Sequence, residues 1–193
     1  MIVNGYAYPT TVHTALNWWL PRLTWLSVFS YGLKKDGSLT GLQDEELVRA
    51  ANNAGVRPVM TLAPVDESGQ FDPETFISVL NDKEACARLL EEIRTNISVK
   101  NMGGINYDIE YLPGEYAQAY ARLVEETRGA LSRDGALTSV ALAPKISSEQ
   151  KGDLYEGHDY GLLGAAADYC VLMTYEWGYT YGPPMAVAPL NKV

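Results

Sequence analysis

The sequence has few of the residues on which several common kinds of site depend. Only two cysteines and two histidines occur among its 193 residues. Two cysteines cannot build the disulfide framework of a small secreted domain, and Cys86 and Cys170 lack the spacing of a metal site. We expect both to be buried, small apolar side chains. With only His13 and His158 present, a histidine zinc site or a Ser-His-Asp triad is disfavoured.

Positive charge and long apolar runs are also scarce. The chain has 15 lysine and arginine residues against 24 aspartate and glutamate residues, a formal net charge of −9. Such a surface repels phosphates and anionic headgroups, so neither nucleic acid nor a membrane is expected as a partner. The most apolar stretch, 162–174, is interrupted by Asp168 and is too short to span a bilayer. Residues 1–5 lack a basic region, so no signal peptide is expected.

The remaining composition is that of a folded globular protein. Hydrophobic residues make up 47% of the chain and charged residues 20%, which argues against disorder. The length predicts one domain over residues 1–193, and no repeat, linker or low-complexity tract marks a boundary.

Strand-like and helix-like segments alternate along nearly the whole chain. Strands are expected at 2–8, 23–31, 57–64, 104–110, 137–144 and 169–175. Amphipathic helices are expected between them, one capped at Asp72-Pro73 and one opened by a capping box at Asn81 and Glu84. This order predicts a parallel sheet with helices outside, either a doubly wound open sheet or a (β/α)8 barrel. No glycine-rich phosphate loop follows the first strand, which weakens the nucleotide-binding form of the open sheet.

The fourth expected strand carries the most informative residues. Side chains alternate between the two faces of a strand, so Asn106, Asp108 and Glu110 share one face while the intervening apolar residues face the helices. A polar, doubly acidic face on a central strand is costly, and at the carboxyl end of a barrel strand such residues are typically catalytic. The alternative is a polar strand end that hydrogen bonds to neighbouring loops.

Asp108 and Glu110 are expected to interact electrostatically, because they lie two residues apart on one face. Like charges at short distance raise the pKa of one partner. Glu110 is the expected proton carrier, since it is last on the strand and nearest the mouth of a barrel. A carboxyl group that stays protonated near neutral pH can protonate a glycosidic oxygen.

Residues 103–110 resemble the Asp-x-x-Asp-x-Asp-x-Glu signature of family 18 glycoside hydrolases, which are (β/α)8 barrels. Asn106 stands where many members have aspartate, and Gly103 stands in the place of the first aspartate. A second segment, Met173-Thr174-Tyr175-Glu176-Trp177, resembles the family's Met-x-Tyr motif. Residues 3–9 and 173–193 are similar to the spore-associated branch, the cortex-lytic and spore-coat N-acetylglucosaminidases, which are often fused to LysM modules.

The resemblance implies a family 18 barrel of which this chain supplies about six of the eight strands. The domain is then incomplete on its C-terminal side, with strands seven and eight, and possible LysM modules, on other segments. It also implies a location in the spore coat or cortex, or outside the cell.

The resemblance further implies a retaining, substrate-assisted mechanism without metal or cofactor. Glu110 takes the position of the general acid/base, Asp108 that of the residue orienting the substrate's acetamido group, and Tyr175 that of the hydroxyl donor to the acetamido oxygen. Asn106 is expected to hold Asp108 by a hydrogen bond.

Four further residues are weaker candidates for substrate binding. Tyr6 either lines the floor of the sugar site or is a packed core tyrosine. Met173 is expected to shape the pocket, and Glu176 and Trp177 to contact a sugar ring.

The leading functional hypothesis is an N-acetylglucosaminidase that cleaves β-1,4 bonds in peptidoglycan of the spore cortex. A chitinase or chitooligosaccharide hydrolase is the enzymatic alternative. A non-catalytic sugar-binding or spore-coat protein is the alternative of another class, and it is favoured if the barrel is truly truncated.

Overall fold

Six parallel strands form one sheet in the computed structural model, which describes residues 1–11, 13–65, 70–178 and 181–191. Each strand pairs with the next one along the chain. The strands are β1 (Asn4–Ala7), β2 (Trp25–Tyr31), β3 (Arg57–Leu62), β4 (Gly104–Tyr107), β5 (Leu137–Leu142) and β6 (Tyr169–Leu172). Sequential order without reversal is that of a (β/α) barrel, whereas a doubly wound sheet reverses direction at a switch point.

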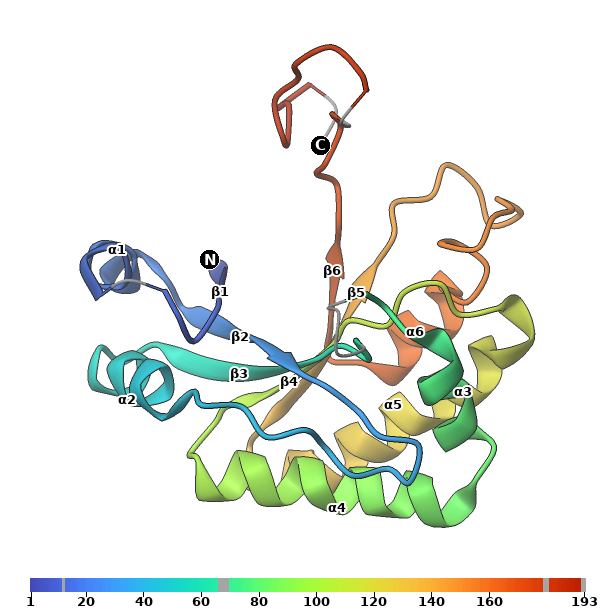
Figure 1. Ribbon diagram of the computed structural model, residues 1–193, viewed down its shortest axis with the longest axis horizontal. Coiled ribbons are helices and arrows are strands. Elements are labelled where there is room, and N and C mark those ends of the chain that lie inside the picture. Colours follow the sequence, from blue (N-terminus) through green and yellow to red (C-terminus); the bar gives the residue numbers. More distant parts are fainter. Residues whose placement is uncertain (12, 66–69, 179–180, 192–193) are drawn as a thin grey trace.

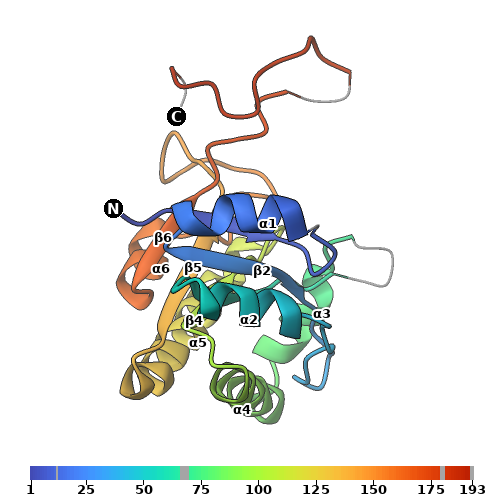
Figure 2. The same ribbon diagram turned by 90° about the vertical axis from the view of Figure 1, so that its left-hand side faces the viewer.

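Helices connect successive strands. They are α1 (His13–Trp19), α2 (Glu45–Asn53), α3 (Pro73–Leu80), α4 (Lys83–Val99), α5 (Ala117–Leu131) and α6 (Tyr160–Ala166), with single 3₁₀ turns at Leu20–Arg22, Gly114–Tyr116 and Ser132–Asp134. Figures 1 and 2 show α4 and α5 side by side along the same face of the sheet, while the chain after β6 extends away from it. None of the described helices is both long and apolar enough to cross a membrane.

The sheet is curled into a half-barrel. This is shown by side chains of distant strands that meet on its inner face. The ring centroids of Trp25 on β2 and Tyr169 on β6 lie 5.1 Å apart in an edge-on arrangement. The amide nitrogen of Asn106 on β4 lies 3.2 Å from the hydroxyl of Tyr6 on β1. The inner face of the half-barrel is therefore shared by the first and the last strands.

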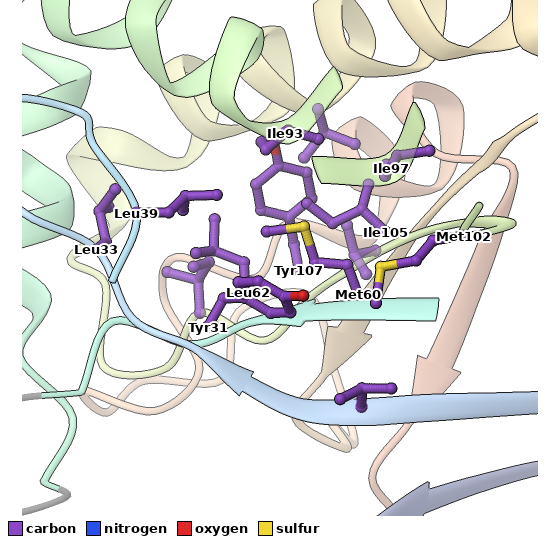
Figure 3. Close-up of a cluster of buried hydrophobic side chains, with 14 of the residues drawn as sticks. Tyr31, Leu33, Leu39, Met60, Leu62, Ile93, Ile97, Met102, Ile105 and Tyr107 are labelled. Carbon is purple, nitrogen blue, oxygen red and sulfur yellow. The ribbon is translucent and has the colours of Figure 1, made fainter. Parts of the chain in front are cut away.

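The outer face of β4 forms the centre of the hydrophobic core. Figure 3 shows Ile105 and Tyr107 of β4 next to Ile93 and Ile97 of α4, and all four side chains are buried. The Tyr107 hydroxyl lies 2.8 Å from the Thr127 hydroxyl on α5, so its polar end is also satisfied. The predicted alternation along β4 is confirmed: the apolar set faces the helices.

Several element boundaries differ from those expected. β4 ends at Tyr107, so both acids follow the strand directly instead of lying within it. Asp72 caps α3 as predicted and accepts a hydrogen bond from the Thr75 amide. Asp82, and not Asn81, caps α4, because Asn81 is already the C-cap of α3.

The outer edge of β6 is exposed. The prediction that both cysteines are buried is wrong: Cys170 on β6 is exposed and Cys86 is only partly buried. Tyr169 and Leu172 of the same strand are exposed as well. Among the described residues β6 pairs only with β5, so its side chains lack the neighbours that a further strand provides.

A buried charged network joins the start of α2, the end of β2 and the end of α4. The Lys100 ammonium lies 2.5 Å from the Asp44 carboxylate and 2.9 Å from the Tyr31 hydroxyl. The Tyr31 hydroxyl also hydrogen bonds to Asp44, whose residue is only 1% exposed. Every charge in the network therefore has a partner.

Replacement of Lys100 tests this network. Lys100→Met leaves the buried Asp44 carboxylate without its cation, so the free energy of unfolding should fall by roughly 3 kcal/mol in urea denaturation. Arg88→Met is the control, because it removes the exposed ion pair with Asp36 and should cost less than about 1 kcal/mol. Equal losses in the two variants would contradict the assigned importance of the buried pair.

Candidate active site

A cavity of about 750 Å³ opens at the carboxyl-terminal ends of the strands. This is the end of a (β/α) barrel at which active sites are found. All six strands or the segments that follow them contribute to its wall. The polar and aromatic residues that line it are Tyr6, Tyr8, Phe29, Phe71, Asp108, Glu110, Tyr111, Tyr155, Tyr175 and Glu176, with Met173 among the apolar ones.

Asp108 is the first residue after β4 and is 8% exposed. Its amide donates to the Leu62 carbonyl of β3 at 2.9 Å, which fixes its backbone at the rim of the sheet. Its Oδ1 atom is buried and has no hydrogen-bond partner among the described residues. Burial raises the pKa of this carboxyl group to about 6, because the ionised form loses solvation.

Glu110 also lines the cavity and is partly exposed. Its pKa is raised to about 7, first by burial, then by the negative charge of Asp108 and by that of Glu176. Of the two acids, Glu110 thus holds its proton to the higher pH. The arrangement offers one carboxyl group that can give a proton near neutral pH and a second that accepts hydrogen bonds beside it.

Asn106 is not one of the residues that line the cavity. Its side chain forms hydrogen bonds to β1, across the half-barrel, and to the neighbouring strand β5. Its amide nitrogen donates to the Tyr6 hydroxyl at 3.2 Å, and its amide oxygen accepts from the Ser139 hydroxyl of β5 at 2.9 Å. The expected hydrogen bond from Asn106 to Asp108 is absent from the described residues. Residues two apart on a strand are separated by roughly 6.6 Å, so short side chains reach neighbouring strands more readily than each other.

Tyr6 therefore belongs to the cavity wall and not to a closed core. It is 41% exposed, and its hydroxyl is oriented by Asn106. Burial and the nearby Asp108 charge raise its pKa, so the hydroxyl stays protonated and can donate. The structure thus excludes a packed core position for Tyr6, while its contact with a sugar stays a prediction.

The segment after β6 brings three of the four candidates from its motif into the cavity. Met173, Tyr175 and Glu176 line it. Burial and the charge of Asp108 raise the pKa of Tyr175 to about 12, which keeps this hydroxyl a donor. Trp177 is not among the lining residues: its amide donates to the Val187 carbonyl and its indole N–H to the Thr174 carbonyl.

Two pairs of aromatic residues in the wall were not identified from the sequence. Tyr8 and Phe29 have ring centroids 5.5 Å apart, and Phe71 and Tyr111 have centroids 6.1 Å apart. Only Tyr111 had a signal in the sequence, because it directly follows Glu110. The others lie on segments that the fold alone brings together. Within the described residues, no three His, Cys, Asp or Glu side chains form a group suited to a metal ion.

Comparison with known proteins shows that this chain is similar to proteins named as spore cortex-lytic enzymes. No protein-family model matches the chain. The chain is 38% identical over 175 residues to the cortical fragment-lytic enzyme of Bacillus subtilis strain 168. The aligned region covers 90% of this chain and 40% of that protein. The crystal structure of the Bacillus cereus spore cortex-lytic enzyme SleL matches with a TM-score of 0.91 at 30% identity, over 98% of this chain and 45% of that one.

A chitinase from Chromobacterium violaceum matches with a TM-score of 0.85 at 20% identity, over 99% of this chain and 61% of the chitinase. This likeness shows a shared fold alone. The predicted resemblance and the fold class are confirmed: the chain forms six strands of a (β/α) barrel like that of family 18 enzymes, and its homologues are named as lytic enzymes. The chain spans less than half the length of the cortex-lytic relatives that it matches.

The raised pKa of Asp108 has a consequence for stability that can be measured. The folded-state pKa of about 6 exceeds the ordinary value of 3.8, so this group lowers the free energy of unfolding as pH rises through that interval. Asp108→Asn should therefore be more stable than the wild type at pH 8, by at most about 3 kcal/mol, and the difference should disappear below pH 4.

Urea denaturation at pH 8 and at pH 3.5 gives the comparison. Asp134→Asn, at an exposed aspartate, is the matched control and should show no such difference between the two pH values. A lower stability of Asp108→Asn at pH 8 would mean that the ionised carboxylate is held by favourable contacts.

Proposed function

We propose that the chain forms the catalytic part of a glycoside hydrolase that cleaves β-1,4 bonds next to N-acetylglucosamine in peptidoglycan of the spore cortex. The observation that carries the proposal is the pair of carboxyl groups with raised pKa values at the mouth of the half-barrel. The names of the homologous enzymes support the substrate class. Residues 1–193 act in this proposal as a single domain.

Glu110 is assigned the role of general acid and then general base. In the first step its proton passes to the leaving glycosidic oxygen, while the carbonyl oxygen of the substrate's 2-acetamido group attacks C1 and the C1–O bond breaks. In the second step a water molecule attacks C1, Glu110 takes its proton and the oxazolinium ring opens with the β configuration retained. No metal or cofactor takes part in either step.

Asp108 and Tyr175 are assigned to the acetamido group. The Asp108 carboxylate accepts from the acetamido N–H and turns the carbonyl oxygen towards C1; its buried Oδ1 atom, which has no partner in the described residues, suits this contact. The Tyr175 hydroxyl donates to the acetamido oxygen. Tyr6, positioned by Asn106, adds a second hydroxyl at the floor, while Met173 and Glu176 complete the wall. Trp177 remains a candidate for contact with a sugar beyond the cavity.

The proposal includes two further strands, outside residues 1–193, that complete the barrel. The relatives are more than twice as long as the region they share with this chain, and strands seven and eight of such a barrel pair with the outer edges of β6 and β1. A LysM module and a location in the spore coat or cortex stay predictions from the resemblance.

The role of Glu110 is tested by Glu110→Gln, which keeps the shape of the side chain but carries no titratable proton. The release of reducing ends from cortex fragments should fall by roughly 100-fold to 10,000-fold, with little change in the affinity for N-acetylglucosamine oligomers. Glu149→Gln, at an exposed glutamate, is the control.

Unchanged turnover in Glu110→Gln would refute the assignment. A wild-type protein that binds the oligomers without cleaving them would instead indicate a sugar-binding protein. Faster cleavage of chitooligosaccharides than of cortex fragments would favour a chitinase.

The pH dependence of kcat/KM tests the pair as a unit. Activity should fall above about pH 7, where Glu110 loses its proton, and below about pH 6, where Asp108 gains one. These limits belong to the coupled pair. Asp108→Asn should lower the rate strongly and remove the acidic limb. It should also move the basic limb to lower pH, since the negative charge that raises the pKa of Glu110 is gone. A change in KM alone would show that Asp108 does not orient the substrate.

A further inference from the structure

His158 connects the segment that carries both acids to the end of the neighbouring strand. The histidine lies between β5 and α6 and is 1% exposed. Its Nε2 atom is 2.7 Å from the carbonyl oxygen of Ile109, the residue between Asp108 and Glu110. Its Nδ1 atom is 2.9 Å from the amide nitrogen of Ala143, which directly follows β5 and lines the cavity.

The two partners determine the protonation of the ring. A backbone amide can only donate, so Nδ1 accepts and carries no proton. A carbonyl oxygen can only accept, so Nε2 carries the proton and donates it. The ring is therefore neutral, in agreement with the lowering of its pKa by burial. A neutral histidine used in this way is not available as an acid or base in the reaction.

The segment that carries His158 packs tightly against the segment that carries the acids. A Cβ atom at Gly157 would lie 2.4 Å from the carbonyl oxygen of Leu112, a distance that only glycine allows without displacement. A Cβ atom at Gly114 would lie 3.3 Å from the Cβ atom of Glu156, so the two segments are also close at this second pair of residues. The imidazole is thus held at a fixed place relative to residues 109–112.

The Ile109 peptide is consequently held from two directions. Its side chain is completely buried in the core on the helix side of β4. Its carbonyl group, which leads directly into Glu110, is held by His158. β4 has already ended at Tyr107, and in the described part of the chain its pairing with β3 ends there too, short of this peptide. Rotation of the peptide between Ile109 and Glu110 would change the direction in which the Glu110 side chain leaves the backbone.

We propose that His158 is a positioning residue: through its hydrogen bond to the Ile109 carbonyl it directs the carboxyl group of Glu110 into the cavity. The inference rests on the proposed function in so far as Glu110 is the acid. A misplacement of a reacting group by about 1 Å can cost roughly 100-fold in rate, so one hydrogen bond at this point has a large effect.

Three replacements separate the two hydrogen bonds of the ring. Glutamine places an amide N–H near the depth of Nε2 and can still donate to Ile109. Asparagine places an amide oxygen near the depth of Nδ1 and can still accept from Ala143. Alanine does neither. His13→Gln is the matched control, because this second histidine is exposed on α1 and its ring lies 3.7 Å from the Glu46 carboxylate, away from the cavity residues.

With the full-length protein and cortex fragments as substrate, kcat should fall by about tenfold or less in His158→Gln and by about 100-fold in His158→Asn and His158→Ala, with KM nearly unchanged. The Gln and Asn variants each keep one of the two hydrogen bonds. If the role of His158 were purely structural, the two variants would lose melting temperature to the same extent and kcat to the same extent. Equal kcat values for His158→Gln and His158→Asn would overturn the proposal.

A measurement that does not depend on activity keeps this inference separate from the proposed function. Titration of the Glu110 carboxyl carbon by NMR should give a midpoint near the wild-type value in His158→Gln and a lower one in His158→Asn, since a misdirected carboxyl group moves into water. Gly157→Ala, which displaces the segment but keeps the ring, should also lower the midpoint. A wild type without cleavage activity would count against the proposed function alone, whereas identical midpoints in all variants would count against the role of His158.

Discussion

The removal of Asp108 from water at the end of β4 is the constraint on which the candidate site depends. A carboxyl group that is 8% exposed, with one oxygen unpartnered in the described residues, would be costly in a protein selected for stability alone. Burial is the main cause that raises the pKa values of Glu110, Tyr6 and Tyr175, and the negative charge of Asp108 raises each of them further. The buried carboxylate therefore adds to the effect of burial in keeping these groups protonated.

The curvature of the sheet gives this carboxylate its surroundings. In a flat sheet β1 and β4 would be three strands apart, roughly 14 Å, yet the Tyr6 hydroxyl and the Asn106 amide are in contact. The same curvature brings Trp25 and Tyr169 together at the opposite end of the strands. A half-barrel that is curled to this degree encloses a cavity without full closure, and β1 and the segment that follows β6 both contribute to its wall.

The motif on β4 predicted the main features of the site because alternation along a strand is a local property. The direction of Tyr107 towards α4 and α5, and of Asn106 towards the inner face, follows from that period alone. The hydrogen-bond partner of Asn106 could not be predicted in this way, since it depends on which strands lie opposite. The exposure of Cys170 had the same origin: an apolar strand pattern does not reveal whether a further strand covers the edge.

By itself the sequence determined the order of strands and helices, the pair of acids at the carboxyl end of β4 and the similarity to spore cortex-lytic enzymes. Only the tertiary structure decided which groups meet these acids. It selected Tyr6 for the cavity wall, left Trp177 outside it and placed His158 against the Ile109 carbonyl. The reason is physical: periodicity and capping act over a few residues, whereas burial, pKa values and hydrogen bonds across the barrel depend on segments 49 to 100 residues apart.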